Sequence, residues 1–167
     1  MRQSILETAP AGLIPAAWIV AILAEFGYFS IRTLLIAHII MCIFLSIFAI
    51  TGWSQMDYGV LRIWRVVIAV GFIVTLISTL GLLWDEHAGM LAAGLYGWML
   101  LPGVALIYTG VEIDSRQELY LAGGLLSFLG AIVAGAVPSV AGIPPLVFGA
   151  ILAGIGQTVA IADAATR

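Results

Sequence analysis

Long apolar runs joined by short connections occupy almost the whole sequence, and they constrain the fold more than any other feature. With 63% hydrophobic and 9% charged residues among 167, the chain lies far outside the soluble norm of about a quarter charged. Several runs approach the roughly 20 apolar residues that a helix needs to cross a hydrocarbon core about 30 Å thick. Since the connections are too short to fold separately, the sequence predicts an all-α integral membrane protein with a single transmembrane domain, residues 1–167.

The apolar runs predict a bundle of about six transmembrane helices, at residues 9–26, 31–52, 64–84, 89–109, 119–137 and 146–162. One continuous helix through the first two runs would be roughly 65 Å long at 1.5 Å per residue, twice the hydrocarbon thickness. The chain must therefore turn between these runs. Gly27 is expected to end the first helix and Ser30 to cap the second.

The arginines predict how the bundle is oriented. Six spans place most of them on one side of the membrane, namely Arg2, Arg62, Arg65, Arg116 and Arg167, and leave only Arg32 on the other. By the positive-inside rule, the N- and C-termini are predicted to be cytoplasmic. All cationic side chains are arginine and the chain is rich in alanine and glycine, which favours a multi-pass protein of a prokaryotic plasma membrane.

The residue types that are missing exclude several functions. Without lysine, the chain cannot form a Schiff base with retinal or pyridoxal phosphate, or build a P-loop. A single cysteine, Cys42, excludes an intramolecular disulfide and a cysteine-based metal cluster. No basic cluster suggests nucleic acid as a partner. The motifs HExxH, GxSxG and CxxC are absent, so an enzyme is not the expected function.

Five titratable side chains form the first candidate site. The stretch LLWDEHAGM places Asp85, Glu86 and His87 between the third and fourth helices, on the predicted outer side, where Glu25 ends the first helix. His38 lies about two turns into the second helix, and charged groups at such depths are functional candidates. Together these side chains could relay protons or bind a cation. The alternative is a solvated loop and a histidine that bonds to a neighbouring helix.

Polar stripes on two helix faces form the second set of candidates: His38, Cys42 and Ser46 on the second helix, and Gly71, Thr75, Ser78 and Thr79 on the third. These stripes could line a polar path that opens outward. The structural alternative is a contact between the two helices, with hydroxyl groups that bond to their own i−4 carbonyls or across the interface. Gln157 is the remaining polar residue inside a span, and an interhelical hydrogen bond would explain it.

Small residues at helical spacing mark the fourth to sixth helices and predict close backbone contacts. Three functional hypotheses remain open. The chain could handle protons, cations or a small solute at the outer polar site, or it could be a structural or accessory subunit of a homo-oligomer or larger membrane complex. It could also bind haem or a pigment, for which His38 and His87 are the only pair of histidines. The bilayer is the one partner common to all three, and a metal ion is left open.

Overall fold

The computed structural model describes the backbone of residues 5–165 and the side chains of residues 12–165. Arg2 and Arg167, which the orientation argument uses, lie outside these residues. The described chain forms six helices: α1 (Ile5–Glu25), α2 (Ile31–Gly52), α3 (Leu61–Leu83), α4 (Ala88–Glu112), α5 (Gln117–Ala136) and α6 (Pro145–Ala165). Helices α2–α6 are long and apolar enough to cross a membrane. In α1, whose side chains are described from Gly12 onward, the apolar part is shorter and comprises Gly12–Glu25. The all-helical class is confirmed, and the number of spans stays a prediction.

Each predicted helix is present, with ends that differ from the prediction by a few residues. Helix α2 begins and ends where expected, and α4 and α6 each continue about one turn further. The two extensions share a cause, since polar residues such as Glu112 and Asp163 can end an apolar run without ending a helix. Helix ends are also the positions where sequence patterns carry least information.

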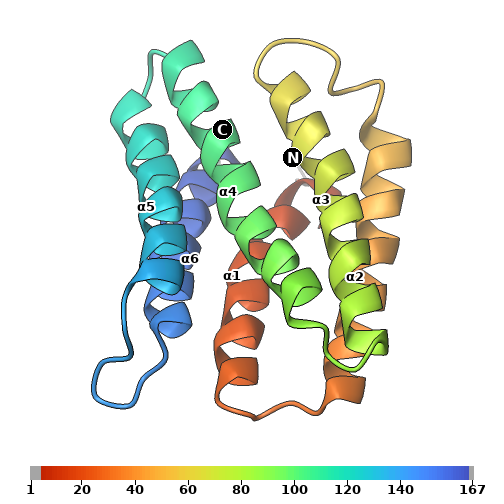
Figure 1. Ribbon diagram of the computed structural model, residues 1–167. Helices are drawn as coiled ribbons and strands as arrows, with labels where there is room; N and C mark the ends of the chain where they lie inside the picture. Colours follow the sequence, from red (N-terminus) through yellow and green to blue (C-terminus); the bar gives the residue numbers. More distant parts are fainter. Residues whose placement is uncertain (1–4, 166–167) are drawn as a thin grey trace.

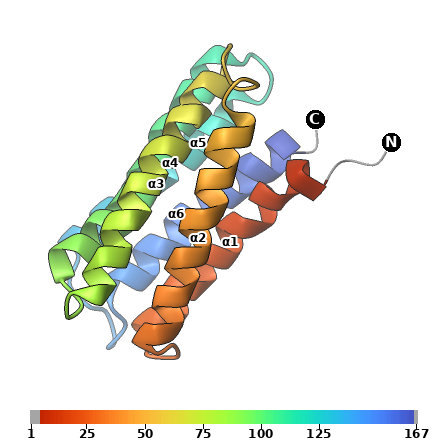
Figure 2. The ribbon, with the colours of Figure 1, turned by 90° about the vertical axis from the view of Figure 1, so that its right-hand side faces the viewer.

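Consecutive helices run in opposite directions, but their neighbours in space follow a different order. Helix α1 packs against α6, while α2 packs against α3, so the row of neighbours runs α2, α3, α4, α5, α6, α1. Figure 1 shows the turn between α1 and α2 at the lower edge of the view, and Figure 2 shows the two helices diverging upward from it. We call the end with the α2–α3 and α4–α5 connections the upper end, and the opposite end, with the other three connections, the lower end (Figure 1).

The turn between α1 and α2 has the predicted chemistry. Gly27 adopts a left-handed φ of +76°, which glycine accepts without steric cost. Its N–H donates to the Ala24 carbonyl over 2.9 Å, closing α1. Ser30 caps α2, because its Oγ accepts a hydrogen bond of 3.2 Å from the Thr33 N–H. Both sequence predictions for this turn are confirmed.

The backbones of α5 and α6 touch where glycines face each other. A Cβ atom built on Gly130 would lie 2.5 Å from the carbonyl oxygen of Gly149, and one on Gly123 would lie 2.6 Å from the oxygen of Gly156. Such approaches are possible only for glycine, and they give the packing on which helices in lipid depend. The predicted close contacts between these helices are therefore confirmed.

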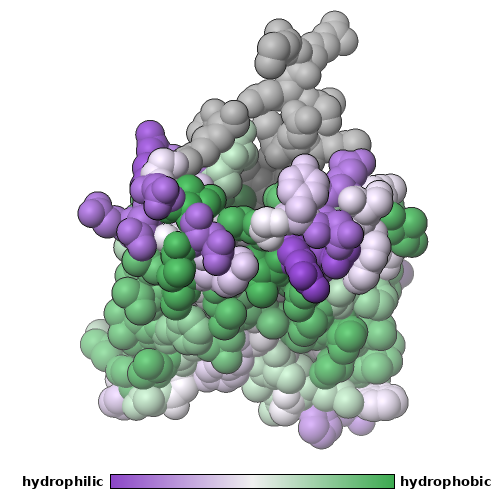
Figure 3. All heavy atoms as spheres, turned by 90° about the horizontal axis from the view of Figure 1, so that it is seen from above, coloured by the Kyte–Doolittle hydropathy of each residue, from purple (hydrophilic) through white to green (hydrophobic). Residues whose placement is uncertain are grey.

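The surface agrees with a multi-pass membrane protein. Seen from the upper end, hydrophilic residues gather on that end, and apolar residues form much of the remaining view (Figure 3). Exposed charged residues at this end include Asp57, Asp114 and Arg116 in the two connections and Arg62 in the first turn of α3. Charged groups thus collect at helix ends, where water and lipid headgroups can solvate them.

Candidate functional site

Gln157 lies at the centre of the fold and joins four helices. Its side chain is 2% exposed, and both of its amide N–H groups are used. One donates to the carbonyl oxygen of Trp98 in α4 over 3.0 Å, and the other to Ser127 Oγ in α5 over 3.2 Å. The Gln157 Oε1 atom accepts a 3.0 Å bond from the Trp18 indole in α1. We call these four residues the central junction.

The central junction has a cause in the sequence of α4. Pro102 lies inside this helix, and a proline has no N–H to donate to the carbonyl four residues earlier, which is that of Trp98. A free carbonyl in an apolar interior is costly unless another donor reaches it. Gln157 supplies this donor from α6. The proline and the glutamine, which look unrelated in the sequence, therefore form one unit.

A second set of hydrogen bonds continues from the central junction to α3 and α2. The Trp98 indole donates to Thr75 Oγ1 over 2.9 Å, and Thr79 Oγ1 donates to the Thr75 carbonyl over 2.7 Å. Thr79 also lies 3.8 Å from Cys42 Sγ in α2, and Ser46 Oγ donates to the Cys42 carbonyl over 2.8 Å. Each of the six helices therefore contributes a side chain to one transverse polar network.

The two predicted polar stripes thus face each other in this network. Thr75 and Ser46 donate to carbonyls four residues earlier in their own helices, as hydroxyl groups in apolar helices do. Ser78 donates instead to the Met90 carbonyl over 3.4 Å. Among the described residues, every buried side-chain nitrogen or oxygen has a hydrogen-bond partner. These contacts occupy the hydroxyl groups of the stripes, and a polar path along them stays a prediction.

The charged candidates at the lower end are not gathered into one group. Glu25 is exposed at the end of α1, and Asp85, Glu86 and His87 are exposed in the α3–α4 connection. Asp85 and Glu86 have left-handed φ values of 49° and 56°, which gives the chain its sharp turn. Within the described part of the chain, no three histidine, cysteine or acidic side chains lie together as a metal site requires.

His38 lies apart from these lower-end groups, part-buried on α2. Its Nδ1 atom is 2.9 Å from the carbonyl oxygen of Leu34, one turn earlier in the same helix. This contact, in which Nδ1 is the donor, satisfies one ring nitrogen within α2. The contact of His38 with Leu34 therefore lies within its own helix, and a role of His38 in proton, cation or haem binding stays a prediction.

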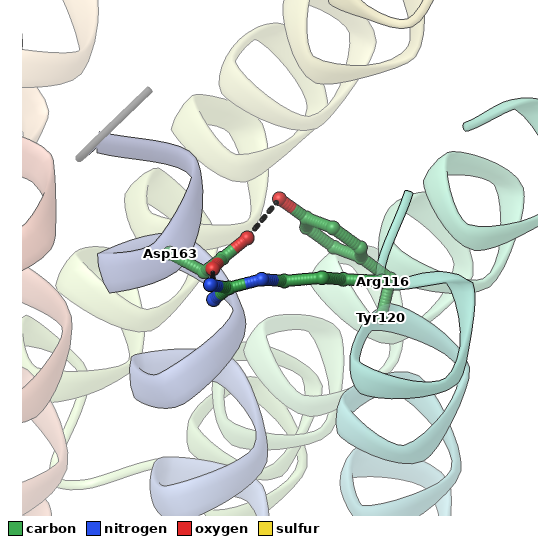
Figure 4. A network of polar contacts seen from close by, with 3 residues as sticks. All are labelled: Arg116, Tyr120 and Asp163. Atoms are coloured by element: carbon green, nitrogen blue, oxygen red, sulfur yellow. Dashed lines mark hydrogen bonds and ion pairs between the residues drawn. The ribbon is translucent and has the colours of Figure 1, made fainter. Parts of the chain in front are cut away.

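A charged cluster at the upper end joins α5 to α6. Arg116 forms an ion pair with Asp163, and the Tyr120 hydroxyl donates to the other carboxylate oxygen over 3.1 Å. Figure 4 shows the guanidinium and the phenol converging on the Asp163 carboxylate. The Asp163 side chain is 6% exposed and that of Arg116 is 67% exposed. The buried carboxylate is thus held by a phenol that is also buried and by a cation that reaches water.

This cluster was not among the sites predicted from the sequence, although its residues carried a signal. Arg116 entered only the prediction of orientation, and the last helix was predicted to end one residue before Asp163. An arginine that begins one helix and an aspartate that ends the next lie on the same side of the membrane in any antiparallel hairpin. This pairing of opposite charges could have been used to predict that the last helix continues through Asp163.

Arg116→Ala is expected to lower the free energy of unfolding by about 1 kcal/mol, because Arg116 is largely exposed and such pairs are weak. The double variant Arg116→Ala/Asp163→Asn should recover part of this loss. The asparagine side chain is neutral and needs no nearby cation, and its oxygen can still accept a hydrogen bond from the Tyr120 hydroxyl. Unfolding in denaturant-titrated micelles measures both values. A double variant that is less stable than Arg116→Ala would contradict this account of the cluster.

A second arginine closes the α2–α3 connection. Arg65 forms an ion pair of 2.8 Å with Asp57, donates to the Trp53 carbonyl over 3.3 Å, and lies with its guanidinium carbon 4.6 Å from the centre of the Trp53 ring. This arrangement combines a cation–π contact with a charge pair. Arg65 therefore orders a connection within the protein.

Comparison with protein-family models, with curated proteins and with solved structures finds no match. The buried polar groups of this chain bond to one another across the helix interfaces. Such contacts fix the positions of helices. The chain is a helical membrane protein of multi-pass architecture.

Proposed function

We propose that this protein is an assembly subunit in the membrane, which presents α2 to a protein partner. The observation that carries the proposal is the contrast in burial among the apolar helices. In the most apolar stretch of α2, 6% of residues are buried, whereas the values for α3–α6 lie between 33% and 44%. Helix α2 has α3 as its main neighbour, so most of its surface lacks a protein contact.

The state of the buried polar groups supports the same proposal. Side chains that handle a solute or a proton need free donors or acceptors at the site. In the described interior, the polar groups are bonded to one another, and the central junction uses both N–H groups of Gln157. This pattern favours a rigid body whose function lies at its surface.

The proposal includes six spans, cytoplasmic termini and a place in a prokaryotic plasma membrane. In an antiparallel bundle, Arg62, Arg65 and Arg116 belong to the upper end, and Arg32 to the lower end. This distribution supports an upper end that faces the cytoplasm. Helix α1, whose backbone is helical from Ile5 to Glu25, would be the sixth span.

The mass of the particle released from its native membrane tests the proposal. An assembly subunit should leave the membrane in a complex heavier than the 17.6 kDa chain when native mass spectrometry is carried out in a mild detergent. Release at low protein concentration and at several detergent concentrations controls for chance association. A particle that has the mass of one chain under all these conditions would contradict the proposal.

Proton, cation or solute handling at the lower end is the second hypothesis, and it has a separate test. The variants Glu25→Gln and His38→Ala remove its two membrane-proximal groups, and the loop residues Asp85, Glu86 and His87 are replaced in a third variant. If the hypothesis holds, ion flux, solute uptake or cation binding should fall in these variants. Unchanged values in all three assays would remove it.

A further inference from the structure

We infer that Arg65 of α3 is the residue that positions α2 for its partner, an inference that rests on the proposed function. Arg65 donates to the carbonyl oxygen of Trp53, the residue that caps the C-terminal end of α2, over 3.3 Å. Its guanidinium carbon also lies 4.6 Å from the centre of the Trp53 ring, and Asp57 pairs with it over 2.8 Å. Arg65 thus ties the upper end of α2 directly to α3.

The polar side chains along α2 hold it to α3 only weakly. The hydroxyl groups of Ser46 and Thr51 donate to carbonyls of α2 itself, so they add no bond between the two helices. Cys42 Sγ lies 3.8 Å from Thr79 Oγ1, and a thiol is a weak donor and a weak acceptor. Within the described part of the chain, the contacts of Arg65 are therefore the strongest polar link between α2 and α3.

Glycine contacts of the kind that join α5 to α6 are directed elsewhere in α3. A Cβ atom built on Gly71 would meet the Trp98 ring, and one on Gly81 would meet Met90, both in α4. The glycines of α3 therefore bring this helix close to α4, and they do not fix the position of α2.

The two ends of α2 are held in different ways. At the lower end, the turn with Gly27 and Ser30 joins α2 closely to α1, and the two helices diverge upward from it (Figure 2). With 22 residues, α2 is about 33 Å long at 1.5 Å per residue. A small change of angle at the turn is carried over this length, so the upper end is where a contact best limits the tilt of α2.

A guanidinium group suits this role because one planar group can make all three contacts. It stacks on an indole ring while its N–H groups donate to a carbonyl and a carboxylate. Carbonyl groups at the C-terminal end of a helix lack partners within the helix, so the bond to Trp53 also completes α2. The Arg65 side chain is 17% exposed, and such partly buried charges are screened less than those in open water.

Distances between spin labels, measured by pulsed electron paramagnetic resonance, test the positioning role. The background is Cys42→Ser, since Cys42 is the only cysteine of the chain. One label at the exposed Leu125 of α5 is paired with a second at Ile50, near the upper end of α2, or at Ile36, near its lower end. Labelled protein is diluted with unlabelled protein in bilayers, so that each distance is measured within one chain.

Arg65→Ala is expected to broaden the distance distribution to Ile50 and to leave that to Ile36 unchanged. Arg65→Lys should broaden the first distribution less, because an ammonium group keeps the charge pair with Asp57 but lacks the planar geometry for stacking. A loss of helix packing in general would broaden both distributions. Equal broadening at the two ends, or no broadening at Ile50 in Arg65→Ala, would overturn the inference.

Arg62→Ala is the matched control. Arg62 is exposed and lies in the first turn of the same helix, and the ion pairs of the described residues involve Arg65 and Arg116 instead. This variant removes a charge from the same end of α3 and should leave both distance distributions unchanged. Broadening in Arg62→Ala equal to that in Arg65→Ala would also overturn the inference.

The complex released from the native membrane links the position of α2 to the proposed function. In Arg65→Ala, the ratio of complex to free chain should fall about fivefold, the effect of losing one charge pair at the upper end of the usual range, and it should stay unchanged in Arg62→Ala. A heavier particle with the same ratio in Arg65→Ala as in the unaltered protein would overturn the inference and leave the proposed function intact. A particle with the mass of one chain would contradict both.

Discussion

Replacing Gly130 by alanine is expected to lower the free energy of unfolding by roughly 1–3 kcal/mol, the usual cost of an overpacked contact. The added methyl group would lie 2.5 Å from the Gly149 carbonyl oxygen, 3.1 Å from the Ala153 nitrogen and 3.3 Å from the Ala153 Cβ. These neighbours belong to α6 and include backbone atoms, so the two helices must separate to admit it. Unfolding in denaturant-titrated micelles measures the effect.

Gly12 provides the matched control for this substitution. It lies within α1, and a Cβ built on it has no neighbour within 4 Å. Gly12→Ala should therefore leave stability unchanged or raise it by up to about 1 kcal/mol, because alanine is the better helix former. If Gly130→Ala and Gly12→Ala had the same effect, close contact between α5 and α6 would not be what stabilises this pair.

Gln157→Leu is the second substitution with a large expected effect. It leaves the Trp98 carbonyl and the Trp18 indole without their partner, and a buried polar group left unpaired costs about 1–3 kcal/mol. Measured hydrogen bonds between membrane helices average about 0.6 kcal/mol, so a total loss of about 2 kcal/mol is expected. The same unfolding assay measures it.

Pro102→Ala should rescue part of this loss, because alanine restores the N–H that can donate to the Trp98 carbonyl within α4. The cost of Gln157→Leu is therefore expected to be smaller by about 1 kcal/mol in the Pro102→Ala background. Trp18→Phe serves as the control, since it removes a different bond of Gln157 and should cost the same in both backgrounds. Equal costs of Gln157→Leu in the two backgrounds would refute the link between Pro102 and Gln157.

The helices of this fold are predictable from sequence because each depends on local information. An apolar run of sufficient length specifies a helix, and Gly27 and Ser30 mark a turn that needs no distant contact to form. The close contact of α5 with α6 was also predictable, because small residues recur there at helical spacing. Chain order alone did not reveal that α1 packs against α6, which depends on where Trp18 meets Gly154 and Gln157.

The polar candidates were harder to interpret because their role depends on how each helix is rotated. The spacing of the two stripes could not distinguish a polar path from an interface between helices. The link between Pro102 and Gln157 depends on the depth at which α4 and α6 meet. Asp163 was not predicted to lie in the last helix, because the apolar run that predicts this helix ends before α6 itself does.

The protein combines a rigid body with a helix, α2, most of whose surface lacks a protein contact. Glycine contacts and the transverse polar network fix the positions of the helices, while α2 has α3 as its main neighbour. Under the proposed function, a protein partner that packs against the rest of α2 would add helix contacts where the chain itself has few.

The most direct test of the proposed function is the contact of α2 with lipid in an intact bilayer. Solid-state NMR of protein with labelled isoleucine methyl groups measures magnetisation transfer from lipid acyl chains, without any substitution. Ile132 on α5, which is 61% exposed, provides the internal reference for a side chain in lipid. If a protein partner covers α2, transfer should be strong to Ile132 and weak to Ile43 and Ile47, whereas equally strong transfer to all three would contradict the proposed function.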